Sequence, residues 1–170
     1  MIASIVIKQI LIFILILFLF ACQKKEQSFE EKKSHKAPIN TISVWVTYWD
    51  NSSKQIRLKP SYQVSYNENF QSLVNEFNKS IRSSTFFKGR SDKYIEAQYV
   101  QNTHDTVHIK ILNNKTLTQQ IGSSGAKEYI ARLTYTMTEI KGISKVYLDF
   151  DPGEHAAPGY YSRKYFEYEF

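Results

Sequence analysis

The sequence contains one cysteine, Cys22, and six glycines among its 170 residues. A single cysteine excludes a disulfide bond within the chain. Six glycines leave little material for a glycine-rich loop that cradles a phosphate group. Basic residues outnumber acidic ones, 22 to 16, but they form no stripe, which argues against nucleic acid as a partner. Aromatic residues, at 15 %, are abundant instead, and large rings help a small domain to bury enough apolar area.

An apolar run long enough to cross a membrane is missing as well. Residues 10–20 are all apolar, but a helix over residues 10–21 would be about 18 Å long, whereas the hydrocarbon core of a bilayer is about 30 Å thick. Extending the helix back to Ile2 would place Lys8 and Gln9 inside the membrane. The segment is instead typical of the short apolar core of a signal peptide.

The end of this segment reads Leu19, Phe20, Ala21, Cys22. Small Ala21 suits a signal peptidase, and a cysteine at the next position specifies the lipoprotein variant of the cleavage site. This is the pattern of a bacterial lipobox, although Phe20 is bulkier than the usual residue there. We therefore expect residues 1–21 to be removed. A lipid on Cys22 is then expected to anchor the protein to the extracytoplasmic face of the cell membrane.

Residues 22–40 are predicted to be the lipidated cysteine followed by a flexible, charged linker. Phe29 and Ile39 are almost its only large apolar residues, so it cannot bury enough surface to offset its chain entropy. As a coil it would hold the following domain about 25 Å from the lipid. Without residues 1–21, which contain one basic residue, the net charge is +5, and anionic headgroups or wall polymers would attract it.

The first half of the domain reads as two extended segments and a helix. Apolar alternation predicts a strand over residues 41–49, followed by a turn at 50–53 and more extended chain over 56–66. Asn67 is a candidate cap for the helix. The apolar residues at helical spacing are Phe70, Leu73, Val74, Phe77 and Ile81.

The second half repeats this theme. Strands are expected over residues 95–99 and 107–111, joined by a turn at 102–105, and a last strand over 146–150. Between them lies the cleanest helical pattern in the chain, formed by Ala126, Tyr129, Ile130, Leu133, Met137 and Ile140.

The ends of that helix carry signals of their own. Ser124 can cap the first amides, and Lys141 followed by Gly142 fits the end of the helix after Ile140. The order of elements predicts an α+β fold, with two helices packed on one face of a mostly antiparallel sheet. We assign residues 41–151 to a single small domain and residues 152–170 to an aromatic C-terminal tail.

Residues 122–148 resemble the second half of the GerMN domain. The helix, the Thr136-Met137 pair where Thr-Leu is usual, the turn at Gly142 and the strand at Val146 carry the resemblance. Residues 107–112 resemble the preceding strand of that domain, and residues 70–81 resemble its first helix.

GerMN domains occur in sporulation and spore-germination proteins, many of which are lipoproteins. The resemblance implies a non-enzymatic module, similar in fold to the ring-building modules of secretion and sporulation assemblies. It also implies a role in an endospore-forming bacterium.

The residues also allow a hydrolase hypothesis. A Gly-x-Ser turn containing Ser124, followed by Asp149 or Asp151 and then His155, has the chain order of an α/β-hydrolase triad. The domain is small for that fold, residues 116–121 make a poor strand, and capping already explains Ser124. We therefore predict no catalytic residues and no enzymatic activity.

Metal binding is not expected either. His104 and His108 have the spacing of a helical zinc pair, but four residues along a strand span about 13 Å, too far to share one metal. Asp151-Pro152-Gly153-Glu154 beside His155 is more typical of a turn than of a cation site. We predict no metal and no cofactor.

Aromatic residues gather in the tail and in the first strand. The tail either adds a strand or strap to its own domain or presents an aromatic–arginine surface to a partner. The candidate partner surface consists of Tyr160, Tyr161, Arg163, Tyr165 and Phe166. Trp45 and Trp49 share one strand face, where they either pack against the core or a helix, or stack on a glycan.

The leading functional hypothesis is a membrane-anchored lipoprotein with a GerMN-like protein-interaction domain. It would act as a non-enzymatic scaffold in sporulation or spore germination, with a protein partner in the envelope or in a sporulation assembly. The alternative is a general cell-envelope lipoprotein that binds peptidoglycan or a small ligand. A third hypothesis, a small envelope hydrolase, requires a deep pocket that contains both Ser124 and His155.

Overall fold

The computed structural model describes residues 40–84, 94–167 and 170. The described residues all belong to one compact unit, Lys36–Phe170. The predicted signal peptide, the lipobox with its cysteine and nearly all of the predicted linker lie outside the described residues. No helix in the described ranges is long and apolar enough to cross a membrane.

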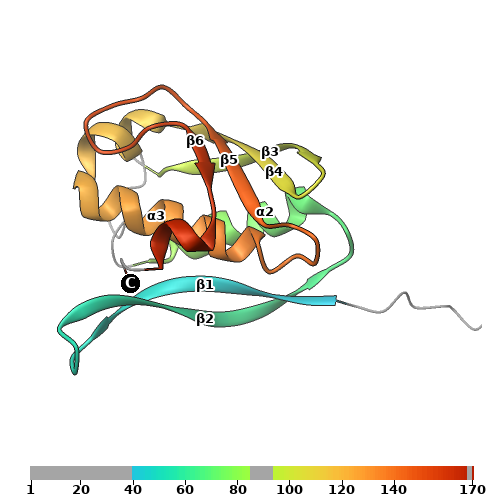
Figure 1. The fold of residues 1–170 in the computed structure, drawn as a ribbon, viewed down its shortest axis with the longest axis horizontal. Coiled ribbons are helices and arrows are strands. Elements are labelled where there is room, and N and C mark those ends of the chain that lie inside the picture. The colour runs from blue at the N-terminus through green and yellow to red at the C-terminus, as the bar shows by residue number, and fades with distance from the viewer. Residues whose placement is uncertain (1–39, 85–93, 168–169) are drawn as a thin grey trace, which may run out of the picture. The chain divides into compact units, whose positions relative to one another are not determined.

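The strands and helices of this unit follow the predicted order, with further elements near the C-terminus (Figure 1). The first half contains β1 (Asn40–Asp50), β2 (Gln55–Tyr66) and α2 (Phe70–Arg82). The second half contains β3 (Glu96–Thr103), β4 (Thr106–Leu112), a π-helical turn η3 (Thr116–Gln120), α3 (Gly122–Met137), β5 (Lys145–Asp149), β6 (Gly159–Tyr161) and a 3-10 turn η4 (Arg163–Phe166).

The strands form two separate sheets. Strands β1 and β2 pair with each other as an antiparallel hairpin and do not join the larger sheet. The larger sheet has the order β3-β4-β5-β6, in which β4 and β5 are parallel and the outer pairs are antiparallel. The α+β class is confirmed, and so is a mostly antiparallel sheet backed by helices; the separate hairpin is an addition to that prediction.

Helices α2 and α3 lie between the two sheets, as Figure 1 shows. Helix α3 contacts β1 on one side and β5 on the other, while α2 contacts β3 and both strands of the hairpin. The domain therefore has three layers: the four-stranded sheet, the helices and the hairpin. Each helix needs two faces that suit different neighbours.

The inner face of the hairpin changes partway along β1. Ile42 and Val44 are buried, but Val46 is only partly buried and Tyr48 is exposed. The pairing register shifts between Val44 and Trp45, and such irregularities change which side chains face inward. The single continuous face that the alternation predicts is therefore limited to the first half of the strand.

Helix α2 buries the predicted apolar face but begins with a different cap. Leu73, Val74 and Phe77 are among its buried residues. The side chain of Asn69, rather than Asn67, accepts a hydrogen bond from the Ser72 amide at 3.0 Å. A left-handed turn at Glu68 (φ 64°) separates the strand from the helix, which moves the cap two residues along the chain.

Helix α3 also has ends that differ from the prediction. It starts at Gly122 (φ 72°), so Ser124 lies within the first turn and does not cap the helix. It ends at Met137 instead of Ile140, and residues 138–142 form turns in which Gly142 has a φ of 90°. Its apolar stripe, including Leu133, is buried as predicted.

The predicted tail forms part of the domain. Its residues supply β6, which extends the four-stranded sheet, and η4, which lies next to the end of α3. Tyr161 and Phe166 are 9 % and 1 % exposed and belong to the hydrophobic core. Of the two alternatives for the tail, the structure has the added strand and strap.

Candidate functional site

The residues of the suggested hydrolase triad do not come together. Ser124 is exposed in the first turn of α3, and its neighbour Ser123 places Oγ 3.2 Å from Nδ1 of His155. Asp151 instead accepts a hydrogen bond from the side chain of Asn114 at 3.1 Å. The segment before Gly122 is a π-helical turn, as the poor strand pattern predicted, so the strand that leads to a hydrolase nucleophile is not present there.

The histidines of the other suggested pair sit in different surroundings. His104 lies at the β3–β4 turn with a φ of 53°, whereas His108 lies on β4 with Nε2 2.9 Å from Oγ1 of Thr103. The described residues contain no group of three potential metal ligands.

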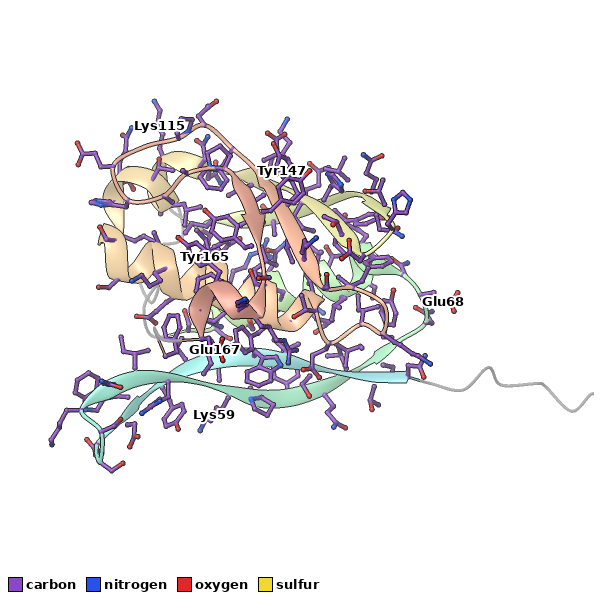
Figure 2. The ribbon with its side chains drawn as sticks, in the orientation of Figure 1. Lys59, Glu68, Lys115, Tyr147, Tyr165 and Glu167 are labelled. Atoms are coloured by element: carbon purple, nitrogen blue, oxygen red, sulfur yellow. The ribbon has the colours of Figure 1, made fainter. Side chains whose placement is uncertain are left out.

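The predicted partner surface needs a correction. Tyr160 and Tyr165 are 64 % and 61 % exposed, and Figure 2 labels Tyr165 near the end of the chain. Tyr161 and Phe166 are core residues, so their assignment to an exposed surface is wrong. The sequence could not separate these residues, because the period of the side chains changes where β6 gives way to η4.

Arg163 is partly exposed, but its guanidinium is engaged by contacts within the domain. Its Nη2 lies 2.6 Å from Glu139 and 3.0 Å from the Tyr135 carbonyl oxygen, and its Nε donates to Thr138. The guanidinium also lies over the rings of Trp45 and Tyr135, at 5.3 and 4.9 Å from their centroids. Arg163 thus ties the C-terminal segment to α3 and to the hairpin.

The outer face of the four-stranded sheet carries a row of three rings, of which the sequence analysis named two, His108 and Tyr160, for separate reasons, and did not name Tyr147. His108, Tyr147 and Tyr160 occupy directly paired positions on β4, β5 and β6. The centroid of the Tyr147 ring lies 5.3 Å from that of His108 and 4.9 Å from that of Tyr160. We call these three residues the aromatic row.

Strand alternation fixes the side on which the aromatic row lies. Val146 and Leu148 are fully buried toward the helices, so Tyr147 between them faces the opposite way. In Figure 2, Tyr147 lies on the far side of the domain from Lys59 of the hairpin. The same alternation was visible in the sequence and could have placed Tyr147 on the surface. Its neighbours on other strands could not be known without the pairing.

The two tryptophans of β1 differ. The Trp45 ring packs against Tyr135 at 5.0 Å, and its Nε1 donates to Glu139 at 3.1 Å. Trp45 is therefore the helix-facing residue that the sequence analysis allowed. Trp49 is exposed and lies at the edge of a cavity beneath the hairpin.

That cavity measures about 570 Å³ and lies between the hairpin and the two helices. Strands β1 and β2 form one wall, the C-terminal part of α2 another, and the first half of α3 the third. Arg132 and Tyr129 of α3 reach it from the buried side, and Glu128 lines it as well. We call this space the hairpin cavity.

Two buried polar groups of the hairpin cavity have perturbed proton affinities. Desolvation lowers the pKa of Arg132, while the nearby Glu128 carboxylate opposes that shift. Burial also raises the pKa of the Tyr129 hydroxyl far above its usual range. Arg132 stays charged and Tyr129 stays neutral at any physiological pH, so the cavity contains a fixed cation and a hydroxyl donor.

No protein-family model, curated protein or solved structure matches this chain. The resemblance of residues 122–148 to the GerMN domain thus stays a prediction from the sequence. Function has to be inferred from the anchor motif, the aromatic row and the hairpin cavity.

Proposed function

We propose that the protein is a lipid-anchored envelope protein whose domain docks onto a protein partner and carries out no reaction. The observation that supports docking is the aromatic row on a sheet face that the two helices do not cover. Aromatic side chains such as tyrosine supply large contact areas at low entropic cost, and they concentrate binding energy in protein interfaces. The hydrolase alternative lacks such support, since His155 contacts Ser123 and not the predicted nucleophile Ser124.

The anchor rests on Leu19, Phe20, Ala21 and Cys22. Two acyl chains on a cysteine supply stable membrane attachment, and the charged linker after it gives the domain reach. The β1 strand starts at Asn40, the last residue of the predicted linker. A partner would therefore be met close to the membrane, at its extracytoplasmic face.

Sporulation or spore germination is the proposed context, and it rests on the GerMN resemblance alone. A ligand-binding envelope protein is the second candidate, and the hairpin cavity favours it. The two functions use different surfaces of the same domain, so they can be tested separately.

Complementation of a deletion strain tests the proposal, with spores formed and spores germinated as the readout and protein level checked by blot. We expect a variant with both Tyr147→Ala and Tyr160→Ala to fail at normal abundance. Tyr165→Ala, which removes an equally exposed tyrosine outside the aromatic row, should complement. Cys22→Ser should fail as well and lose its fatty-acid label, because the lipid is the proposed anchor.

The same assay separates docking from catalysis. Ser123→Ala and Ser124→Ala should each complement, since exposed side chains of this kind contribute little to stability. His155→Ala, at a partly buried position, should complement as well, provided that its protein level is normal. Complementation by the Tyr147/Tyr160 variant would contradict the docking face. Failure of a stable Ser123→Ala or Ser124→Ala protein would contradict the absence of enzymatic activity, because a nucleophile cannot be replaced by its neighbours.

A further inference from the structure

Arg132 is buried without an opposite charge beside it. Arg132 lies in the second half of α3, and the residue is 6 % exposed. Nε donates to the Trp45 carbonyl oxygen at 3.4 Å and Nη2 donates to Ser80 Oγ at 3.2 Å, so both partners are neutral. Across the described ranges, no carboxylate lies within ion-pair distance of this guanidinium. A buried guanidinium is costly unless an anion compensates it.

Glu128 does not supply that compensation by contact. It lies one helical turn before Arg132, and its Oε2 accepts a hydrogen bond from Thr47 Oγ1 at 2.8 Å. That bond holds the carboxylate toward β1. Glu128 favours the charged form of Arg132 only through space. A guanidinium has five N–H donors, and the two bonds described above leave donors for a further acceptor.

The Tyr129 hydroxyl is a second, independent observation at the same cavity. Tyr129 is 2 % exposed, and its hydroxyl has no hydrogen-bond partner. Buried hydroxyls in native proteins nearly always have a partner, so a group without one needs an explanation. Both Tyr129 and Arg132 line the hairpin cavity. The hydroxyl oxygen is itself closed off from solvent, so an acceptor bound in the cavity would satisfy the cation directly and the hydroxyl after a small movement of the cavity wall.

We propose that the hairpin cavity binds an acidic saccharide, with the carboxylate or phosphate group of the sugar on Arg132 and Tyr129. The planar fork of arginine matches both a carboxylate and a phosphate. The structure therefore assigns a negative charge to the ligand, and the experiment decides which of the two groups carries it. A volume of about 570 Å³ lies within the range of small-molecule sites.

The remaining lining suits the body of a sugar. Tyr48, Trp49 and Tyr62 line the rim and are partly exposed, so their rings offer apolar faces for a pyranose ring. The Glu128 carboxylate can accept hydrogen bonds from sugar hydroxyls. The choice of a saccharide rests on the proposed location outside the membrane. The need for a negative charge rests on Arg132, and the Tyr129 hydroxyl adds the need for a hydrogen-bond acceptor.

Binding to the purified full-length mature chain in detergent tests the inference and does not depend on location or docking. Three probes share one ring: N-acetylmuramic acid carries a carboxylate, N-acetylglucosamine 6-phosphate carries a phosphate, and N-acetylglucosamine is neutral. We expect at least one acidic sugar to bind about tenfold more tightly than the neutral one, measured by calorimetry or NMR titration. Which acid binds more tightly distinguishes the two sources of charge.

Two variants and a control locate the site. Arg132→Met removes the charge at similar length and should abolish the preference for acidic sugars. Tyr129→Phe removes a hydroxyl that has no partner in the unliganded protein, so its melting temperature should not fall while its affinity drops several-fold. Arg57→Met, which removes a half-exposed arginine of the hairpin that does not line the cavity, should bind as the wild type does.

Three outcomes would overturn the inference. They are equal binding of the acidic and neutral sugars, no binding of either acidic sugar at about 10 mM, and unchanged affinity in Tyr129→Phe. If Arg132→Met does not fold, the comparison of the probes on the wild type and the affinity of Tyr129→Phe still decide whether the cavity binds an acidic sugar. A negative result here would leave the docking face untouched.

Discussion

The two sheets cover opposite sides of the same two helices, but they are attached in different ways. The four-stranded sheet meets the helices through fully buried aliphatic side chains, among them Val107, Ile109, Val146 and Leu148. Such an interface is stabilised in proportion to the apolar area it removes from water and leaves no room for solvent or ligand.

The hairpin is attached by fewer buried apolar side chains, Ile42 and Val44 among them, and by polar contacts further along β1. The Trp45 amide donates to Thr136 Oγ1 at 3.0 Å, and Thr47 donates to Glu128. Arg132 reaches from α3 to the carbonyl oxygen of Trp45. Since hydrogen bonds of this kind add only about 1 kcal/mol each, the hairpin should be the less stable of the two attachments.

Helix α3 takes part in both attachments, that of the four-stranded sheet and that of the hairpin. Glu128, Arg132 and Thr136 are spaced four residues apart and contact the hairpin, whereas Ile130, Leu133 and Met137 form the buried apolar stripe. The apolar stripe maintains the fold, while the polar side borders the cavity. Binding sites are often found where local stability is low, because a ligand needs access and adaptable neighbours.

The largest effect should come from breaking the apolar attachment. Leu133→Asp places a charge among fully buried side chains, and the expected cost of several kcal/mol is comparable with the whole stability of a small domain. We expect no cooperative thermal unfolding transition for this variant. Lys141→Asp, an exposed acidic substitution just after the helix, should melt close to the wild type.

A near-native melting temperature for Leu133→Asp would contradict the division of α3 into two faces. Circular dichroism records the transition, and proteolysis of the purified chain provides an independent measure of folding. If Lys141→Asp were as damaging, the added negative charge itself would be responsible, and not its burial.

Both helices were predictable because their apolar residues recur at helical spacing. Leu73, Phe77 and Leu133 all lie on the faces that this spacing indicates. Helix ends were less predictable, since Asn67 and Asn69 are equally good caps in the sequence and only the backbone decides between them. After Met137 the backbone continues in turns with hydrogen bonds to the third residue before, and Ile140 stays buried there. Its apolar character therefore extended the predicted α-helix too far.

The division of the strands into two sheets could not be predicted from the sequence. Alternation predicts that a strand exists, but it does not identify the neighbouring strand, so neither the separate hairpin nor the parallel pairing of β4 with β5 followed from it. The aromatic row and the hairpin cavity depend on that pairing. Arg132 looks like an ordinary polar residue of an amphipathic helix until β1 is placed over it.

A moderate effect is expected from Arg163, which fastens the hairpin at its polar interface. Arg163→Ala removes the bond to Glu139 and the contacts with the rings of Trp45 and Tyr135. The side chain is 39 % exposed, so solvent screening keeps the expected loss to about 1 kcal/mol. Hydrogen exchange of the β1 amides should accelerate while exchange in β4 stays slow.

Two further variants sharpen this result. Lys164→Ala removes the exposed neighbouring cation and should change neither strand. Arg163→Lys keeps the charge but loses the planar fork, so it should lie between the wild type and the alanine variant. Equal acceleration in β1 and β4 would show that the two sheets open as one unit and would contradict the proposed difference between their attachments.

The smallest effect concerns the turn at the far end of the hairpin. The Asp50 carboxylate accepts hydrogen bonds from the Ser52 amide at 3.0 Å and from the Ser52 and Ser53 hydroxyls at 2.6 and 2.7 Å. These bonds, those from Ser52 first, lower the pKa of Asp50 from 3.8 to about 2. The group stabilises the turn only while it is ionised.

The direction of the pH effect follows from proton binding. Between pH 3.8 and about 2 the unfolded chain binds more protons at Asp50 than the folded chain, so stability falls as the pH is lowered through this window. Asp50→Asn cannot ionise. Its melting temperature should therefore lie below that of the wild type at pH 5, and the two should converge near pH 2. Asp149→Asn is the matched control, because it makes the same change of charge at an exposed carboxylate on β5. Among the described residues, Asp149 accepts no side-chain hydrogen bond. An Asp50→Asn difference that stays constant from pH 5 to about 2 would show that the serines hold the turn without the charge, because only an ionisable acceptor can couple the hairpin to pH.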